Sequence, residues 1–196
     1  MKKLVGIAAV AAVMLAGSAC TNTQKNVNDN VAQQGEQATD SKVLVAYYSA
    51  TGTTEKAAER VADATGGQLY RIEPVEPYTE ADLDYENKDS RSAKENVDRS
   101  LRPEIKKGLD VAQYETVYLG FPVWWDKAPL VINTFLESYD FSGKNIIVFA
   151  TAHSSGLTPS YETLKTDFPK YNFEEGSILN VQGEKSFDEW VEGLKK

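Results

Sequence analysis

Apolar runs alternate with amphipathic segments along most of the chain, and this pattern predicts both strands and helices. Residues 43–49, "VLVAYYS", form a continuous apolar run bounded by small residues, which is typical of a strand buried on both faces of a parallel sheet. The following segment, 53–66, places Ala57, Val61 and Ala62 near helical spacing and ends in glycine. A strand followed at once by an amphipathic helix is the opening of a βαβ unit.

The alternation continues to the end of the chain. Further strands are predicted at 68–75, 114–122, 144–149 and 176–183, and further helices at 89–99, 128–140, 158–168 and 186–196. Strands that alternate with helices indicate one α/β domain with a parallel sheet, which we expect to cover residues 42–196.

Three unusual loops follow predicted strands, and they are the candidate sites of chemistry. We call 49–54 ("SATGTT") the first loop, 120–129 ("GFPVWWDKAP") the second loop and 150–156 ("ATAHSSG") the third loop. In a parallel α/β sheet, ligands bind outside the carboxyl ends of the strands. The three loops are therefore expected to open on the same edge.

The first loop combines four hydroxyl side chains with a glycine: Ser49, Thr51, Gly52, Thr53 and Thr54. It leads directly into a helix, whose first N–H groups and dipole attract anions. It contains no lysine or arginine and lacks the pattern of a nucleotide triphosphate loop. This favours a phosphate monoester held by neutral dipoles. The alternative is that Thr51 or Thr53 only caps the helix, which would use one hydroxyl.

The second loop places two tryptophans, Trp124 and Trp125, shortly after Pro122. Aromatic residues at the end of a strand are often part of the core. Adjacent side chains on an extended segment point to opposite sides, however, so at least one indole should leave the core. A tryptophan at the edge of a loop can stack on a flat heteroaromatic ligand. Together with the first loop, this predicts a site for a phosphorylated planar cofactor.

These loops resemble those of the flavodoxin family. The first loop has the family's Ser/Thr-x-Thr-Gly-x-Thr form, and Phe121-Pro122-Val123-Trp124-Trp125 is similar to the Tyr/Phe-Pro-x-Trp-Trp loop of one bacterial subgroup. The resemblance runs from Lys42 to the C-terminus. It implies a flavodoxin-like three-layer fold, a five-stranded sheet of order 2-1-3-4-5, and noncovalently bound FMN. Ala50 departs from the hydroxyl residue common in some flavodoxins.

The resemblance also implies roles for individual residues. The first loop would hold the FMN phosphate, and the second and third loops would flank the isoalloxazine ring and the ribityl chain. The implied flanking residues are Pro122, Val123, Trp124, Trp125, Thr151, Ala152, His153, Ser154, Ser155 and Gly156.

The third loop departs from the subgroup, because Ala152-His153-Ser154 replaces a Ser-Gly-Gly-like run. His153, the single histidine, is either a solvent-exposed loop residue or lies near the flavin, where its protonated form would stabilise the anionic reduced ring. A hydrolytic pair of His153 with Ser154 or Ser155 is a third interpretation. Neighbouring residues rarely form such a pair, and no G-x-S-x-G motif is present.

The N-terminal 19 residues have two lysines, an apolar stretch and small residues before Cys20, which is the pattern of a secretory signal. Cys20 resembles the lipidated cysteine of a bacterial lipoprotein, although Leu15 lies further from it than the usual aliphatic residue. Ordinary cleavage after Ala19 is the alternative. The polar residues 20–41 are predicted to form a flexible tether. We therefore expect an exported protein, anchored in a bacterial cell envelope if Cys20 is lipidated.

The net charge of −8 and the pI of about 4.8 argue against nucleic acid as a partner. With one histidine and one cysteine, no metal site is expected. An acidic surface suits docking of a redox partner protein, so electron transfer through FMN is the expected function. Reduction of quinones or similar small acceptors, and a binding lipoprotein without cofactor, are the alternatives.

Overall fold

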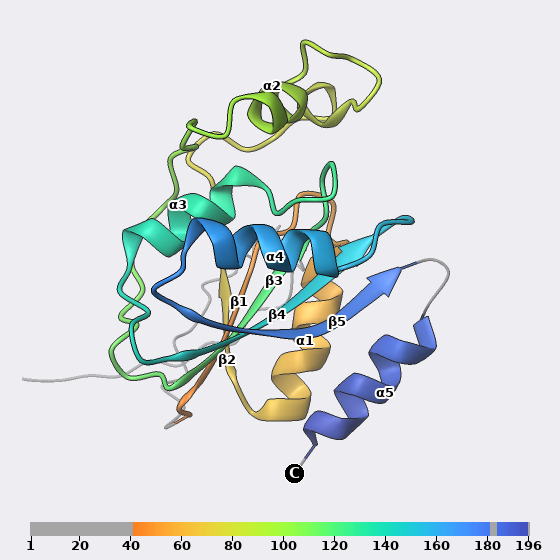
Figure 1. Ribbon diagram of the computed structural model, residues 1–196. Coiled ribbons are helices and arrows are strands. Elements are labelled where there is room, and N and C mark those ends of the chain that lie inside the picture. Colours follow the sequence, from red (N-terminus) through yellow and green to blue (C-terminus); the bar gives the residue numbers. More distant parts are fainter. Residues whose placement is uncertain (1–40, 181–183, 196) are drawn as a thin grey trace, which may run out of the picture. The chain divides into compact units, whose positions relative to one another are not determined.

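The computed structural model describes residues 41–180 and 184–195, in which five parallel strands form one sheet (Figure 1). The strands are β1 (Val43–Tyr47), β2 (Gln68–Arg71), β3 (Thr116–Pro122), β4 (Asn145–Ala152) and β5 (Asn172–Asn180). Their order across the sheet is β2-β1-β3-β4-β5, and every pair is parallel. This confirms the expected α/β fold with a sheet of order 2-1-3-4-5.

Helices cover both faces of the sheet and make three layers (Figure 1). They are α1 (Thr53–Thr65), α3 (Leu130–Ser138), α4 (Thr158–Asp167) and α5 (Glu184–Leu194). The segment between β2 and β3 adds the short 3-10 helix η1 (Ala81–Leu83) and α2 (Arg91–Val97). The side chains of α1 and α5 share one core cluster with the sheet, and those of α3 and α4 share the other.

Strand β1 shows why its sequence is apolar at every position. Successive side chains point to opposite faces of a sheet. Leu44 and Ala46 pack in the core beneath α3 and α4, whereas Val45 and Tyr47 pack against α1 and α5. All four are buried, and fully burying one aliphatic side chain stabilises a fold by roughly 1.5–3 kcal/mol.

Several predicted boundaries were wrong, and β4, for example, runs to Ala152 and not to 149. β2 ends at Arg71, not at 75, because Pro74 has no N–H for the ladder and the chain turns to pair with the segment around Ile105. β5 begins at Asn172 instead of 176, since an edge strand tolerates the polar residues at its start. α5 begins at Glu184, two residues before the expected start.

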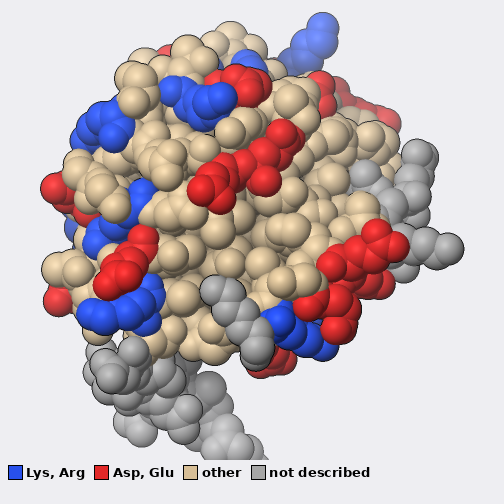
Figure 2. Space-filling model, turned by 60° about the horizontal axis from the view of Figure 1, so that its bottom comes forward, with Lys and Arg blue, Asp and Glu red and all other residues tan. Residues whose placement is uncertain are grey.

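The surface charge is mixed on the face that Figure 2 shows. Acidic and basic side chains lie there in small neighbouring groups separated by uncharged surface. The net charge of −8 is therefore not gathered into one acidic field on this face.

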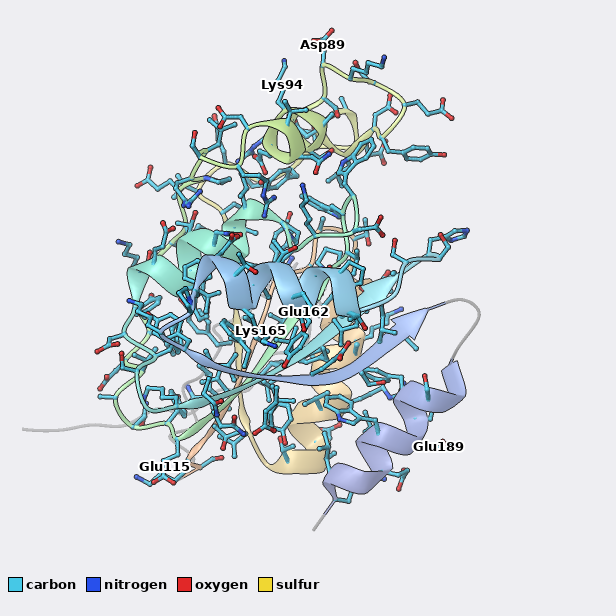
Figure 3. The ribbon with its side chains drawn as sticks, in the orientation of Figure 1. Asp89, Lys94, Glu115, Glu162, Lys165 and Glu189 are labelled. Carbon is cyan, nitrogen blue, oxygen red and sulfur yellow. The ribbon has the colours of Figure 1, made fainter. Side chains whose placement is uncertain are left out.

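The first part of the long segment between β2 and β3, residues 76–103, lies beyond the carboxyl ends of the strands, and we call it the insert (Figure 3). The chain then returns along the sheet to the start of β3, and the N–H groups of Gly108 and Leu109 donate to the Tyr139 hydroxyl, just after the end of α3. Asp89 and Lys94 project at the outer end of the insert, whereas Glu115, just before β3, lies at the opposite end of the sheet. α2 begins after Ser90, whose Oγ accepts a hydrogen bond of 3.3 Å from the N–H of Ala93. The insert thus stands at the same end of the sheet as the three loops.

The predicted signal segment, Cys20 and the tether up to residue 40 lie outside the described residues, so those assignments stay predictions. Within 41–180 and 184–195, no helix has the length and apolar content needed to span a bilayer. The same residues contain no group of three or more His, Cys, Asp or Glu side chains placed to hold a metal ion.

Candidate functional site

A cavity of about 370 Å³ lies where the three loops meet, at the carboxyl ends of β1, β3 and β4. We call it the cofactor cavity. Its lining residues are Ala50, Thr51, Thr53, Thr54, Leu83, Pro122, Val123, Trp124, Thr151, Ala152 and His153. All of these except Ala50 and Leu83 belong to the set predicted from the sequence. The loops therefore open on one edge and share one hollow.

The first loop turns sharply so that a glycine, and no hydroxyl residue, precedes α1. Gly52 has φ of 87°, a left-handed conformation that favours glycine, and its N–H donates to Ser49 Oγ at 3.0 Å. No side chain caps α1, so the alternative that Thr51 or Thr53 serves as its cap was wrong. Among the described residues, the N–H groups of Thr53 and Thr54 have no acceptor. They remain available for an anion at the helix N-terminus.

Thr151 ties the three loops together. Its hydroxyl shares a buried hydrogen bond of 2.7 Å with the hydroxyl of Thr54, and its carbonyl accepts from the N–H of Val123 at 2.8 Å. Both threonine side chains are almost completely buried. One residue of the third loop thereby sets the distance between the first and the second.

A carboxylate and an arginine lie behind the first loop. Glu55, in the first turn of α1, accepts a hydrogen bond of 2.8 Å from the Tyr47 hydroxyl and pairs with Arg71 at 2.9 Å. Arg71 also donates to the carbonyl of Ser49 at 3.3 Å. Burial, followed by the bond to Glu55, raises the pKa of Tyr47 well above its ordinary value. Arg71 thus offsets the Glu55 charge that would otherwise oppose an anion in the loop.

Trp124 and Trp125 point to different environments, as the sequence predicts. Trp124 lines the cofactor cavity and meets Tyr48 and Tyr78 edge to face, with ring centroids 5.7 and 5.2 Å apart. Trp125 is 42% exposed and does not line the cavity. Residues 124–127 form a turn, in which Trp124 and Lys127 each donate a backbone hydrogen bond to the other. Trp125, inside this turn, has a φ of 54°. Trp124 is therefore the indole that can face a ligand.

The predicted residues of the third loop divide into two groups. Thr151, Ala152 and His153 line the cavity, whereas Ser154, Ser155 and Gly156 do not. His153 is exposed, and within the described part of the chain no hydrogen bond joins it to either serine. The arrangement offers no nucleophile–base pair and gives the hydrolytic interpretation no support. Ser49, Gly52 and Trp125 also lie outside the lining, although Ser49 and Gly52 shape the first loop.

Sequence reasoning missed the residues of the insert that hold Tyr78, the ring that contacts Trp124. The Tyr78 hydroxyl lies 2.7 and 2.9 Å from the two oxygens of Glu95, a buried carboxylate that also pairs with Arg91 at 2.9 Å. The Arg91 guanidinium stacks 3.9 Å from the centre of the Tyr78 ring. Burial, the hydrogen bond and the Glu95 charge raise the pKa of Tyr78. The only sequence signal is the i,i+4 spacing of Arg91 and Glu95 in α2.

Comparison with known families gives one clear result. A family model described as flavodoxin matches residues 42–194. No functionally curated protein matches the chain.

Solved structures agree with the family match. A provisionally assigned flavoprotein from Bacteroides uniformis is 46% identical, with 76% of this chain and 96% of that chain covered and a TM-score of 0.72. A similar protein from Bacteroides eggerthii is also 46% identical, with 78% and 96% covered and a TM-score of 0.72. A flavoprotein from Lactobacillus acidophilus, solved in complex with FMN, is 21% identical, with 76% of this chain and 97% of that chain covered and a TM-score of 0.55. The likeness to the Lactobacillus acidophilus protein shows the fold alone.

Proposed function

The chain belongs to the flavodoxin family, and we propose that it is a redox protein that holds FMN noncovalently in the cofactor cavity. The observation that carries the proposal is that an anion-binding loop and a planar aromatic side chain line the same cavity. A loop of neutral donors at the N-terminus of α1 suits a phosphate monoester, and the indole of Trp124 suits a planar ring. FMN has both groups, and the related flavoprotein from Lactobacillus acidophilus was solved with it.

The residues present fit this cofactor. Thr51, Thr53 and the first N–H groups of α1 would hold the phosphate, and Gly52 has no Cβ to obstruct its approach. Trp124 and His153 would flank the ring. When bound, FMN supplies reversible uptake and release of electrons. The protein's part is to orient the flavin ring. Tyr48 and Tyr78 contact Trp124 and hold its indole in place, so that the indole can position that ring.

We assign the chain to electron transfer between partners and not to catalysis on a small acceptor. The net charge of −8 supports docking of a positively charged redox protein, because complementary charge speeds association. Reduction of a quinone or similar acceptor would instead require that the acceptor bind beside the ring.

Titration of the purified protein with FMN and with riboflavin, followed by flavin fluorescence, tests the proposal. We expect FMN to bind with a Kd below about 1 μM and riboflavin to bind about 100-fold more weakly, since it lacks the phosphate. Trp124→Ala should weaken FMN binding about tenfold or more, whereas Trp125→Ala, its matched control, should leave it unchanged. The absence of saturable FMN binding would overturn the proposal.

A potentiometric reduction of the FMN-loaded protein separates the two redox roles. Two resolved one-electron steps fit a carrier. A single two-electron step, with rapid oxidation by a small quinone, would refute the carrier assignment.

A further inference from the structure

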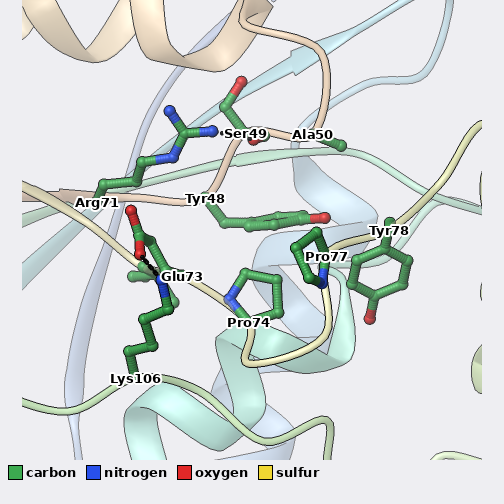
Figure 4. A pocket seen from close by; sticks show the side chains of 10 residues that line it. Tyr48, Ser49, Ala50, Arg71, Glu73, Pro74, Pro77, Tyr78 and Lys106 are labelled. Carbon is green, nitrogen blue, oxygen red and sulfur yellow. Dashed lines mark hydrogen bonds and ion pairs between the residues drawn. The ribbon is translucent and has the colours of Figure 1, made fainter. Parts of the chain in front are cut away.

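A second cavity, of about 220 Å³, shares Ala50 with the cofactor cavity and lies at the carboxyl ends of β1 and β2 (Figure 4). Its lining residues are Tyr48, Ser49, Ala50, Arg71, Ile72, Glu73, Pro74, Pro77, Tyr78 and Lys106. An apolar cavity of about 150 Å³ is known to hold benzene. This one therefore has room for one substituted six-membered ring but not for a second flavin.

The unpaired hydroxyl of Tyr48 indicates that this cavity is a binding site. The side chain is only 2% exposed, yet its oxygen has no hydrogen-bond partner among the described residues. In the described part of the chain, every fully buried side-chain nitrogen or oxygen has a hydrogen-bond partner. The Tyr48 oxygen has none, so it is not fully enclosed and must face open space. Tyr48 lines this cavity and not the cofactor cavity. Burial raises the pKa of Tyr48, which keeps the hydroxyl protonated as a donor.

The charged lining offers more donors than acceptors. Arg71 uses one N–H for Glu55 and one for the Ser49 carbonyl, out of the five that a guanidinium carries. Lys106 bonds to Glu73 at 2.7 Å and keeps two further N–H groups. Each cation is already paired with one carboxylate, Arg71 with Glu55 and Lys106 with Glu73, so the lining offers spare N–H donors and no excess of positive charge. A carboxylate, whose two oxygens each accept hydrogen bonds, matches these unused donors.

The walls favour a flat ring with oxygens at both ends. In Figure 4 the Tyr48 ring lies above Pro74 and Pro77, and its hydroxyl points away from Arg71 and Lys106. The cationic donors thus lie at one end of the cavity and the phenolic donor at the other. Proline and tyrosine rings provide an apolar surface between the two ends.

We propose that this second cavity binds a single-ring aromatic carboxylate with an oxygen substituent opposite the carboxylate. The carboxylate lies toward Arg71 and Lys106, and the opposite oxygen accepts a hydrogen bond from Tyr48. The assignment does not depend on FMN, because the two cavities have only Ala50 in common.

Calorimetric titration of the purified protein with 4-hydroxybenzoate, with and without saturating FMN, tests the assignment. We expect saturable binding in both states with a Kd below about 1 mM. Benzoate, which lacks the second oxygen, and 4-hydroxybenzamide, which lacks the charge, should each bind about tenfold more weakly.

Two variants identify the contacts. In Tyr48→Phe, 4-hydroxybenzoate and benzoate should bind equally, because only the hydroxyl distinguished them. Lys106→Gln changes an exposed side chain and should weaken both acids about fivefold. Lys165→Gln on α4, which also removes a surface lysine with one ion pair, should leave binding unchanged.

Three results would overturn the assignment. The first is no saturable binding up to about 10 mM, a concentration at which a site of the expected strength is full. The second is equal affinity for the acid and the neutral amide. The third is displacement of 4-hydroxybenzoate by FMN, which would place it in the cofactor cavity.

Discussion

The four hydroxyl residues of the first loop have separate tasks. Ser49 accepts from Gly52 and shapes the turn, and Thr54 joins the third loop through Thr151. Thr51 and Thr53 are exposed at the cavity, with only a weak contact of 3.4 Å between their hydroxyls. Those two side chains are therefore the ones able to turn toward a phosphate.

The variant Thr53→Val tests this division. It keeps the branched shape in the first turn of α1 but removes the hydroxyl, so FMN affinity should fall about tenfold while riboflavin affinity stays the same. Fluorescence titration with both flavins measures the ratio. Thr163→Val, which removes an exposed hydroxyl from α4, is the matched control and should change neither affinity. An equal loss for both flavins would mean that Thr53 supports the loop and not the phosphate.

At this scale the sequence predicts much of the site, because the hydroxyl loop and the tryptophan pair are contiguous motifs. It does not predict Arg71, whose relation to the first loop arises only when β2 pairs with β1 and places Arg71 beside Tyr47. It also leaves undecided which indole faces the cavity, since that depends on the left-handed turn at Trp125 and Asp126.

Among the elements, β3 depends on a glycine at the position where it pairs with Phe149 of β4. A Cβ at Gly120 would lie 2.3 Å from the ring of Phe149, a fully buried side chain on the neighbouring strand. The ring thus occupies the space that any side chain at position 120 would need. This contact fixes the position of β3 against β4 at Gly120, the first residue of the second loop.

We expect Gly120→Ala to destabilise the protein by about 1–3 kcal/mol, because the overpacked ring must leave its rotamer or move the strand. Urea denaturation measures the change. Adding Phe149→Leu should return part of that loss relative to the two single variants, which a double-mutant cycle detects. Gly193→Ala in α5, where a Cβ meets nothing within 4 Å, should be neutral or slightly stabilising. Additive single effects would refute the proposed clash.

Element types follow from sequence pattern more closely than element ends do. β5 starts with Asn172 and includes Glu174 and Glu175, residues that carry no strand signal, yet they pair with β4. The pairing partner supplies the strand there, and a local pattern does not contain it.

For the whole molecule, buried tyrosines make stability depend on alkaline pH. Tyr47, Tyr48 and Tyr78 all have a pKa raised above the ordinary 10.0, with burial as the largest cause. In the unfolded chain these phenols release protons near pH 10, whereas the folded chain keeps them. The unfolded state then binds fewer protons, so the contribution of these phenols to the free energy of unfolding is constant below pH 10 and decreases above it.

We expect a decrease of up to about 1.4 kcal/mol per pH unit for each such phenol above pH 10. Urea denaturation between pH 8 and 11 measures the slope. Tyr78→Phe should make this slope shallower by up to the contribution of one phenol. Tyr85, whose side chain is 73% exposed, provides the control variant Tyr85→Phe, which should leave the slope unchanged. A slope that is the same in the native and Tyr78→Phe proteins would contradict the assignment.

The order of the strands was expected from family resemblance and not from periodicity, because the alternation of strands and helices is compatible with several strand orders. The position of the insert over the cofactor cavity was not predicted in detail. Leu83 reaches the lining and Tyr78 meets Trp124 only through tertiary packing.

The glycine that precedes α1 has one more consequence, which concerns folding. A helix that begins without a capping side chain leaves its first N–H groups to water, and capping side chains typically stabilise a helix by about 1 kcal/mol. In the proposed complex the phosphate takes over the task of the cap. The cofactor would then be part of the helix end, and the population of folded protein would rise with the supply of FMN as well as with the strength of the core.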